Sequence, residues 1–442
     1  MLLGLNISSS RMNNILLSKR DKILLLLFFG FVTVFELYHV ALGTNPPTML
    51  RMLYTAVYLV FAVLSPALIP TYTAVNLIVE RFSSVFGEFL PNTLLFHVAV
   101  LVFGLLCIRA KQPLLMKRSY DKRPFKWFVI LYVYGILSLL LHINVPPDFS
   151  FVIDGAFMFV FLYYLCISKD KYIRSILVYS VAAMAVVCTI GLFNYDNLVS
   201  DYSTSLGDVD RLDWKDANYF SFFIGIMLLL TLYLAKYAVS KSSRRIFIFI
   251  AFVMLVTMVS LISRGAIVAL TIALIYYYRK ELLSFRNLGY LLLVAVAVAG
   301  LYYSGILEGL IMRFMSEDVQ TGSGRTELWK IGLQTFFSKG PLTILFGAGE
   351  GQALSMTYMK GEYWSPHNNY LSIMYNYGIF GLILFCVWIF SMLVRCRTRE
   401  SRGLLLFIAV NSLTIVPFTY VSTVWFMIPL IMIWDRRLSG RI

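Results

Sequence analysis

This sequence has little charge, few cysteines and no long polar stretch before Gly305. Asp, Glu, Lys and Arg make up only 14% of its 442 residues, whereas soluble proteins carry roughly 25% of such residues. Because apolar runs recur along the whole chain, a separate soluble catalytic domain is excluded. No structural disulfide is expected, since all five cysteines lie inside apolar runs or at their inner ends: Cys107, Cys166, Cys188, Cys386 and Cys396.

Apolar side chains, by contrast, are abundant. Hydrophobic residues make up 59% of the sequence, and its mean hydropathy is +0.77. A transmembrane helix needs about 20 apolar residues. The runs therefore predict an all-α polytopic membrane protein that contacts membrane lipid along much of its length.

The net charge of +15 reflects membrane topology and needs no nucleic-acid partner. Seven basic clusters hold 28 of the 38 Lys and Arg residues but only 5 of the 23 Asp and Glu residues. This segregation follows the positive-inside rule, so we expect the clusters and both termini to be cytoplasmic. The clusters span residues 11–22, 109–126, 169–174, 236–245, 279–286, 395–402 and 436–441.

An even number of crossings must separate successive cytoplasmic clusters, and this parity predicts about 14 transmembrane helices, or 12 to 13 if some segments are re-entrant. We expect a cytoplasmic N-terminus (1–21), a membrane domain (22–305), a large external catalytic loop with short interfacial helices (306–376), and C-terminal helices with a cytoplasmic tail (377–442). Beside two hairpins, the expected spans are 22–42, 49–66, 92–108, 127–143, 151–167, 175–192, 217–235, 288–304 and 377–394, with a weaker one near 67–79.

The two hairpins, 246–278 and 403–434, are shorter than the roughly 40 residues that two crossings need, so their turns must be recessed. The first turn carries Ser263-Arg264-Gly265. An arginine at membrane depth costs at least about 2.5 kcal/mol, so Arg264 either reaches the interface or faces a cavity with a partner. Ser263 can cap a helix that begins at Gly265, and an arginine beside a helix N-terminus is an arrangement that binds phosphate.

A second candidate lies in the large external loop, at Gly322-Ser323-Gly324-Arg325. Apolar residues then recur at helical spacing from Trp329 onward, which predicts an amphipathic helix on the outer membrane interface. Arg325 precedes Trp329 by one turn and shares its face. Taken alone, this spacing favours an arginine that binds lipid headgroups.

The third candidate is Ser365-Pro366-His367-Asn368-Asn369. Serine as N-cap and proline at the first helical position predict a helix start, with His367 in the first turn. There the helix dipole favours a neutral imidazole that can accept a proton. A structural role for His367 is the alternative. The remaining histidines are expected to be structural: His39, His97 and His142.

Together these segments resemble the O-antigen polymerase and O-antigen ligase superfamily of bacterial inner-membrane proteins. The resemblance covers residues 215–395 and depends on the order, spacing and common side of the motifs. The motifs are Asp216-Ala217-Asn218-Tyr219, Ser263-Arg264-Gly265-Ala266, Gly324-Arg325 followed by Leu328-Trp329, and Pro366-His367-Asn368-Asn369-Tyr370-Leu371.

The resemblance implies an inverting glycosyltransferase that acts at the periplasmic face without metal or other cofactor. Its donor would be a glycan on undecaprenyl pyrophosphate, and a chain-length regulator is an implied partner. The resemblance further implies that Arg264 and Arg325, with Ser263, hold the donor diphosphate, and that His367 acts on the acceptor hydroxyl. It makes Asn218, Asn368 and Trp329 candidate supporting residues.

The acceptor distinguishes two activities: a polymerase extends a lipid-linked repeat, whereas a ligase transfers glycan to the lipid A core. We favour a polymerase, because 322–325 and 367–371 read more like polymerase members, and keep a ligase as the alternative. A transporter or flippase of lipid-linked sugars is more distant, because the sequence shows no internal repeat with paired broken helices.

Two further motifs receive plainer interpretations. Asp208-Val209-Asp210 could hold a divalent ion, but it lies in an aspartate-rich loop that we interpret as solvated. Gly347-Ala348-Gly349-Glu350-Gly351 lacks the strand–turn–helix context of a dinucleotide site. We interpret it as a mobile turn that places the His367 helix.

Overall fold

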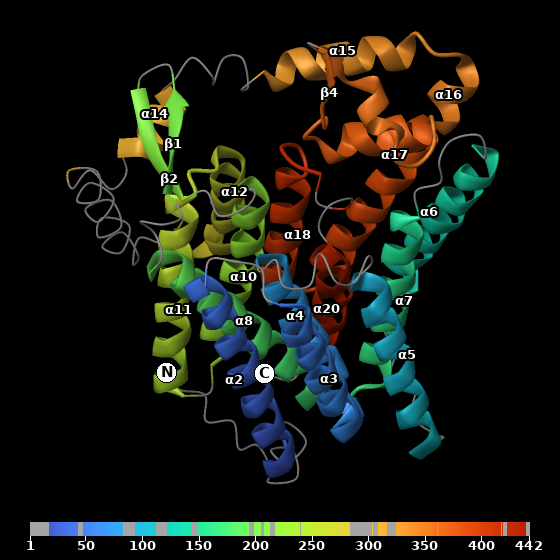
Figure 1. Ribbon diagram of the computed structural model, residues 1–442. Helices are drawn as coiled ribbons and strands as arrows, with labels where there is room; N and C mark the ends of the chain where they lie inside the picture. The colour runs from blue at the N-terminus through green and yellow to red at the C-terminus, as the bar shows by residue number, and fades with distance from the viewer. Residues whose placement is uncertain are drawn as a thin grey trace. The chain divides into compact units, whose positions relative to one another are not determined.

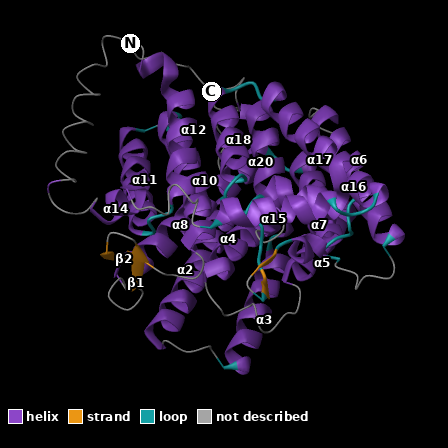
Figure 2. Cartoon of the chain, turned by 90° about the horizontal axis from the view of Figure 1, so that it is seen from above, coloured by secondary structure: helices purple, strands orange, loops and turns teal. Residues whose placement is uncertain are grey.

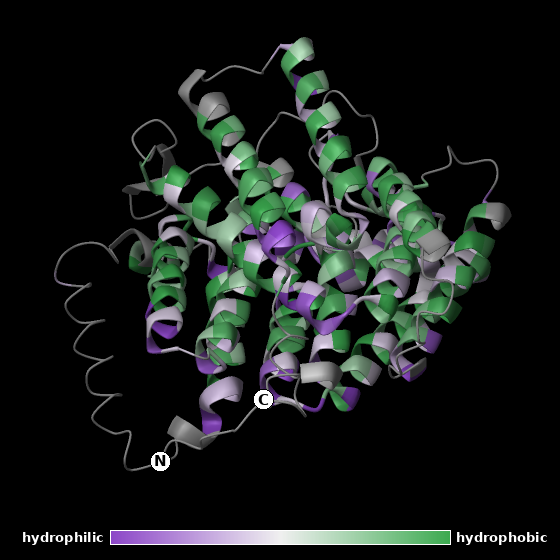
Figure 3. Ribbon diagram, turned by 90° about the horizontal axis from the view of Figure 1, so that it is seen from below, coloured by the Kyte–Doolittle hydropathy of each residue, from purple (hydrophilic) through white to green (hydrophobic). Residues whose placement is uncertain are grey.

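The computed structural model describes residues 17–42, 47–82, 93–111, 122–142, 149–193, 199–204, 207–212, 217–238, 240–282, 303, 308–315, 324–359, 361–416, 418 and 422–438. These residues are predominantly helical, with strands in two short hairpins (Figure 2). Hydrophobic residues dominate most of the helices (Figure 3). All five cysteines are free, as expected.

The chain divides into two compact units. Unit 1 comprises Met1–Tyr120, Ile153–Ile190 and Ser422–Ile442, and unit 2 comprises Asp121–Val152 and Gly191–Val421. The helices of unit 1, seen in Figure 1, are α2 (Lys19–Leu42), α3 (Thr48–Leu64), η1 (Pro66–Leu68), α4 (Ile69–Phe82), α5 (Thr93–Lys111), most of α7 (Ser150–Ile167), most of α8 (Asp170–Phe193) and α20 (Ser422–Leu438).

A sharp bend separates α3 from α4. Pro66 follows Ser65, and because proline cannot donate the backbone hydrogen bond that continues a helix, α3 ends there. The helix axes differ by 114° across this break. The weak span expected near 67–79 is therefore a helix that turns away from α3.

The interior of unit 1 contains a network of polar side chains. Tyr54 Oη donates to Asn76 Oδ1 at 2.6 Å, and Asn76 Nδ2 lies 3.2 Å from His97 Nε2. Tyr58 Oη lies 3.4 Å from His97 Nδ1 and 3.1 Å from Thr73 Oγ1. His97 is only 1% exposed, so it is a structural histidine, as its sequence setting indicated.

Unit 2 holds the segments that carry the sequence motifs. Its helices are α6 (Lys122–Leu141), α10 (Ala217–Lys236), α11 (Lys241–Ser260), α12 (Arg264–Leu282), α14 (Glu308–Met315), α15 (Arg325–Phe337), α16 (Pro341–Phe346), η4 (Gln352–Met356), α17 (Asn369–Arg395) and α18 (Arg399–Asn411). Helix α10 packs against α11, α12 against α18, and α17 against α6 and α16.

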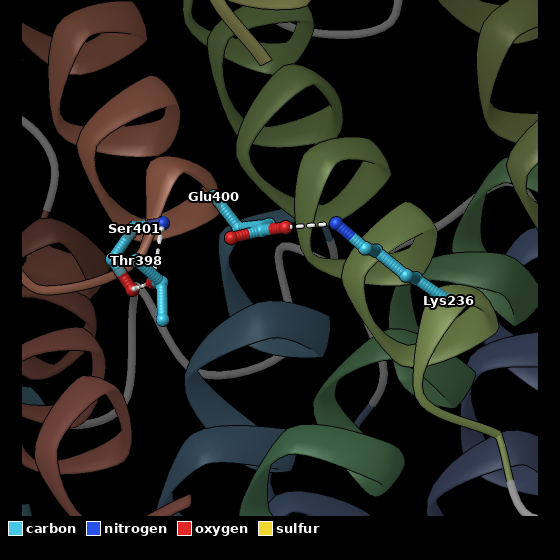
Figure 4. Close-up of polar contacts among 4 residues, drawn as sticks. All are labelled: Lys236, Thr398, Glu400 and Ser401. Atoms are coloured by element: carbon cyan, nitrogen blue, oxygen red, sulfur yellow. Dashed lines mark hydrogen bonds and ion pairs between the residues drawn. The ribbon is translucent and has the colours of Figure 1, made fainter. Parts of the chain in front are cut away.

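An ion pair joins the C-terminal end of α10 to the N-terminal end of α18. Lys236 Nζ contacts Glu400 Oε1, and the Glu400 side chain is only 6% exposed (Figure 4). The same end of α18 is capped by Thr398, whose Oγ1 accepts from the Ser401 backbone N–H at 3.2 Å. These contacts lie within two of the basic clusters, 236–245 and 395–402.

Five described helices are long and apolar enough to cross a membrane, or six if α3 and α4 form one bent span. The five are α7, α8, α10, α11 and α17. The chain is thus a predominantly helical protein with several membrane-spanning candidates, whereas the total of 14 stays a prediction. The expected span 288–304 lies outside the described residues, except for Tyr303.

The structure adds two short β-hairpins to the predominantly helical architecture that was predicted. The acidic loop forms an antiparallel hairpin of β1 (Val199–Thr204) and β2 (Gly207–Leu212), in which Asp201 pairs with Asp210. A second, shorter hairpin pairs β3 (Tyr358–Met359) with β4 (Glu362–Tyr363). Hydropathy detects apolar runs, and neither hairpin contains one, so hydropathy could not predict them.

Candidate functional site

The turn that follows α18, residues 411–416, is the point in unit 2 where the sequence motifs meet. Arg325 Nη1 donates to Thr414 O at 2.9 Å, and the Asn369 N–H donates to Ser412 O at 2.8 Å. Gly265 packs closely on the Thr414 side chain, since an added Cβ would lie 2.4 Å from Thr414 Oγ1. Gly265, Arg325 and Asn369 are far apart in the sequence, and all three contact this one turn.

This turn belongs to the second of the two short hairpins. The sequence indicated that the turns of both hairpins are recessed, and Gly265 and Thr414 place the two turns in contact. The side chains in the second turn carried no recognisable motif. Hairpin length was thus the only sequence signal for it, and Thr414 was missed as a site residue.

Arg264 opens α12 directly after a tight turn. Helix α11 ends at Ser260, and Ile262 adopts a left-handed conformation with φ 50°. A β-branched residue rarely adopts positive φ, so the turn holds the backbone in a strained state next to Arg264. The Arg264 side chain is half-buried.

Ser263 connects this turn to α10. The helix begins at Arg264 rather than at Gly265, and Ser263 is 2% exposed. Its hydroxyl donates to Asn218 Oδ1 at 3.1 Å. Two residues that the sequence singled out separately, Ser263 and Asn218, are therefore hydrogen-bonded, and the α12 N-terminus is fixed against the start of α10.

Arg325 is the first residue of α15, as the glycines before it predict. Gly324 supplies the left-handed N-cap conformation, with φ 76°, which glycine adopts without steric cost. The Arg325 side chain is half-buried, and its bond to Thr414 O fixes one edge of the guanidinium. A guanidinium has five N–H donors, and the bond to Thr414 O uses one of them.

The amphipathic helix α15 packs on the protein itself. Phe336 is fully buried in a cluster with Met356 of η4 and with Met374 and Tyr375 of α17. The next residue, Phe337, is 55% exposed. Interfacial contact with lipid stays a prediction for the exposed side of this helix.

The structure corrects the position of His367. Helix α17 begins at Asn369, and its N-cap is Asn368, whose Oδ1 accepts from the N–H groups of Tyr370 and Leu371 at 3.0 and 3.2 Å. His367 therefore precedes the helix and does not lie in its first turn. It adopts φ 45°, so a non-glycine residue in the left-handed region lies inside this motif and another, Ile262, directly precedes the Ser263-Arg264 motif.

Trp329 links the Arg325 helix to the His367 segment. Its Nε1–H donates to Pro366 O at 2.6 Å. Trp329 lies one turn after Arg325, and Pro366 directly precedes His367. This bond holds the non-helical segment 365–368 against α15. The role of Trp329 as a supporting residue, which the resemblance implies, stays a prediction.

Helix α17 is broken at Gly378, which has φ 69° and ψ −172°. The carbonyls freed at the break are bound by the glycine-rich turn: the Ala348 N–H donates to Tyr375 O at 2.9 Å, and the Gly349 N–H donates to Asn376 O at 3.0 Å. The turn that we expected to place the His367 helix does contact it, and it is held there by main-chain hydrogen bonds.

His142, at the end of α6, contacts this glycine-rich turn. Its Nε2 lies 3.1 Å from Gly347 O and its Nδ1 lies 2.8 Å from Ser138 O. Both partners are carbonyl oxygens, so the ring has a structural role here, as expected for His142. The side chain of His39 lies outside the described residues.

The described residues contain no group of three or more His, Cys, Asp or Glu side chains that would suit a metal ion. Asp208 and Asp210 lie in strand β2, and their side chains are outside the described part. The described polar contacts at the 411–416 turn come from arginine, asparagine, threonine and tyrosine groups. In these contacts Arg325 and the Thr414 hydroxyl donate, whereas Asn411 Oδ1 and Tyr219 Oη accept.

A comparison with protein families matches residues 249–386 to the family described as O-antigen ligase. The matched stretch begins in α11, ends in α17 and includes Arg264, Arg325 and His367. This match confirms the resemblance to the O-antigen polymerase and ligase superfamily. No curated protein matches the chain.

Proposed function

Because residues 249–386 match the O-antigen ligase family, we propose that the protein is an inverting glycosyltransferase that polymerises repeat units of O-antigen or a related surface polysaccharide. The observation that carries this proposal is the meeting of three motifs at the 411–416 turn. Arg325 donates to Thr414 O, and Gly265, the neighbour of Arg264, packs on the same residue.

In the proposed reaction, the donor is a glycan linked to undecaprenyl pyrophosphate. The acceptor hydroxyl oxygen attacks the anomeric carbon while its proton passes to the His367 ring. The bond from the anomeric carbon to the phosphate oxygen breaks, and its electron pair stays on the departing lipid diphosphate. Attack from the face opposite the leaving group inverts the anomeric configuration.

Arg264 and Arg325 act on the charge that grows on the leaving diphosphate. Fixed donors aimed at developing charge lower the barrier because they need little reorganisation during the reaction. Ser263 and the N-terminus of α12 lie beside Arg264, and a helix N-terminus adds N–H donors and a favourable dipole. Two guanidinium groups thereby take the place that a divalent cation has in many diphosphate-transferring enzymes.

His367 is the proposed general base. The Trp329–Pro366 bond and the Asn368 cap hold the backbone on either side of it. We propose supporting roles for Asn218, which accepts from Ser263, and for Asn368 through this cap. No cofactor is invoked in this mechanism.

The proposal places the site at the periplasmic face of the inner membrane, with cytoplasmic termini, about 14 spans in all and the loop 306–376 outside. Reporter fusions after residues 42, 193 and 395 test this topology. A periplasmic reporter is expected to be active after the first two positions and inactive after the third. The opposite pattern would place the site in the cytoplasm and exclude a lipid-linked donor at the outer face.

A ligase is the second candidate, since the matched family is described as O-antigen ligase. Deletion of the encoding gene followed by electrophoresis of the surface polysaccharide separates the two. A single repeat left on the lipid A core identifies a polymerase, as we propose. A core without any glycan identifies a ligase, and unchanged glycan would contradict both activities. A chain-length regulator is expected only in the first case.

A further inference from the structure

Unit 1 contains a cavity of about 230 Å³ that none of the functional motifs explains. It lies where several helix ends meet: the start of α2, the α3–η1 break, the end of α5, the end of α7 and the start of α8. Three of the basic clusters, 11–22, 109–126 and 169–174, fall at these ends. The cavity therefore lies at the side of unit 1 that the charge pattern assigns to the cytoplasm.

A buried carboxylate faces this cavity. Asp21 is 9% exposed, and its two oxygens accept hydrogen bonds from Ser65 Oγ and Tyr172 Oη, each at 3.2 Å. No ion pair to Asp21 exists within the described part of the chain. A carboxylate accepts about four hydrogen bonds, and a buried one without a cation is costly. Asp21 is thus suited to receive a cation from a ligand.

The rim of the cavity has the opposite charge. Arg20 and Lys169 line it and are exposed, and Arg20 Nη2 donates to Leu64 O at 2.9 Å. That bond fixes the guanidinium at the rim. The remaining wall includes apolar side chains, among them Ile108 and Ile167. The buried end of the cavity therefore carries a negative charge, and its exposed rim carries positive charges. One wall of the cavity is apolar.

We infer that this cavity binds the headgroup of an aminophospholipid, a zwitterion with a primary amine and a phosphate. The amine donates to Asp21, the phosphate lies between Arg20 and Lys169, and the glycerol end contacts the apolar wall. Basic pockets between membrane helices bind lipid headgroups. A purely anionic headgroup would leave Asp21 without a cation, and a quaternary amine has no N–H to donate. This inference is independent of the proposed transferase activity.

The test uses the full-length purified protein in detergent, with lipid binding followed by native mass spectrometry. Phosphatidylethanolamine, phosphatidylglycerol and phosphatidylcholine with identical acyl chains are the three lipid probes. We expect the ethanolamine lipid to bind about tenfold more tightly than the other two, because its amine makes charge-assisted hydrogen bonds to Asp21. Soluble phosphoethanolamine at the same concentration is expected to bind far more weakly.

Variants assign the binding to this cavity. Asp21→Asn keeps the shape of the side chain and the acceptor for Ser65. This variant should lose the preference for phosphatidylethanolamine but still bind phosphatidylglycerol. Lys169→Gln should weaken the binding of all three phospholipids severalfold. Lys241→Gln, at an exposed lysine, is the matched control and should leave lipid binding unchanged. An unchanged preference in Asp21→Asn, equal binding of all three lipids, or tight binding of soluble phosphoethanolamine would each overturn the inference.

Discussion

The two units satisfy their buried polar groups in different ways. In unit 1, Tyr54, Asn76 and His97 bind one another through their side chains, and all three lie inside helical stretches of α3, α4 and α5. In unit 2, side chains bind main-chain carbonyls at places where helices end or break: Arg325 binds Thr414 O, and Trp329 binds Pro366 O. The first pattern fixes how helices pack, whereas the second fixes backbone that is not helical.

This difference has a physical reason. Irregular backbone at membrane depth is tolerated only where protein or a water-filled cavity satisfies its polar groups. A network of side chains inside a regular bundle needs no such backbone. Unit 2 therefore holds the segments whose conformation must be specified residue by residue, and the candidate catalytic groups lie on those segments.

The largest expected effect is on His367. His367→Ala should lower turnover by about two to four orders of magnitude, the usual contribution of a general base, and leave binding of the lipid diphosphate nearly unchanged. The wild-type rate should fall as the pH is lowered from about 8 to 5, because the protonated ring cannot accept a proton. A rate assay with a lipid-linked glycan measures both.

A second substitution at the same position separates chemistry from backbone strain. Asparagine tolerates the left-handed conformation, so His367→Asn should keep the melting temperature and still lose the activity. Full turnover in either variant, or a flat pH profile, would show that His367 is structural.

The arginines come next. Arg264→Ala and Arg325→Ala should each lower turnover by about 10² to 10³, the usual cost of removing one preorganised donor from developing charge. Lysine should not restore the rate, because an ammonium cannot make the paired contacts of a guanidinium. Lys330→Ala, on the exposed side of α15, is the control. Equal losses in all three variants would point to general charge attraction instead.

The break in α17 provides a test of stability. Gly378→Ala should destabilise the protein by about 2–5 kcal/mol, because positive φ costs about 1–2 kcal/mol and overpacking adds about 1–3 kcal/mol. An added Cβ would lie 2.3 Å from Leu345 O. Gly361 also has positive φ but open space around it, so Gly361→Ala should show the backbone cost alone. Thermal unfolding in detergent compares the two.

A smaller effect is expected at Trp329. Trp329→Phe removes the donor to Pro366 O, a bond worth about 0.5–1.5 kcal/mol, and should slow turnover severalfold by loosening the His367 segment. A Trp364→Phe variant, at an exposed side chain two residues before Pro366, is the control. If both variants behave alike, the Trp329 bond does not position His367.

The smallest expected effect is that of chelation. With arginines opposite the diphosphate, activity should be unchanged in excess EDTA. Asp208→Asn and Asp210→Asn should also be active. A loss in EDTA that magnesium or manganese restores would contradict this and assign a metal-binding role to those two aspartates.

Hydropathy predicted most helices of the fold well. The expected span 217–235 is α10, which runs from Ala217 to Lys236, and the expected span 151–167 is α7. These elements follow from apolar runs, which are a local property. The hairpin at 199–212 could not be predicted in the same way, because its pairing depends on register between two polar segments.

The roles of the candidate site residues stay predictions, and the contacts between them could not be predicted from the sequence. The Ser365-Pro366 pair is a good helix start by local rules, yet Asn368 caps the helix. The deciding contact is distant in sequence: the Asn369 N–H binds Ser412 O, which fixes where α17 begins. No single-sequence pattern could have indicated Thr414 as the residue that Arg325 contacts.

The break in α17 has a consequence for how the protein opens. The segment before Gly378 shares its hydrogen bonds with the glycine-rich turn, whereas the segment after it continues as ordinary helix. Cooperative units follow shared contacts, so amide hydrogen exchange should group residues 369–377 with 347–353 rather than with 379–395. Helix α17 would then contain two segments whose amides exchange independently. The segment next to His367 would unfold locally without disturbing the rest of the helix.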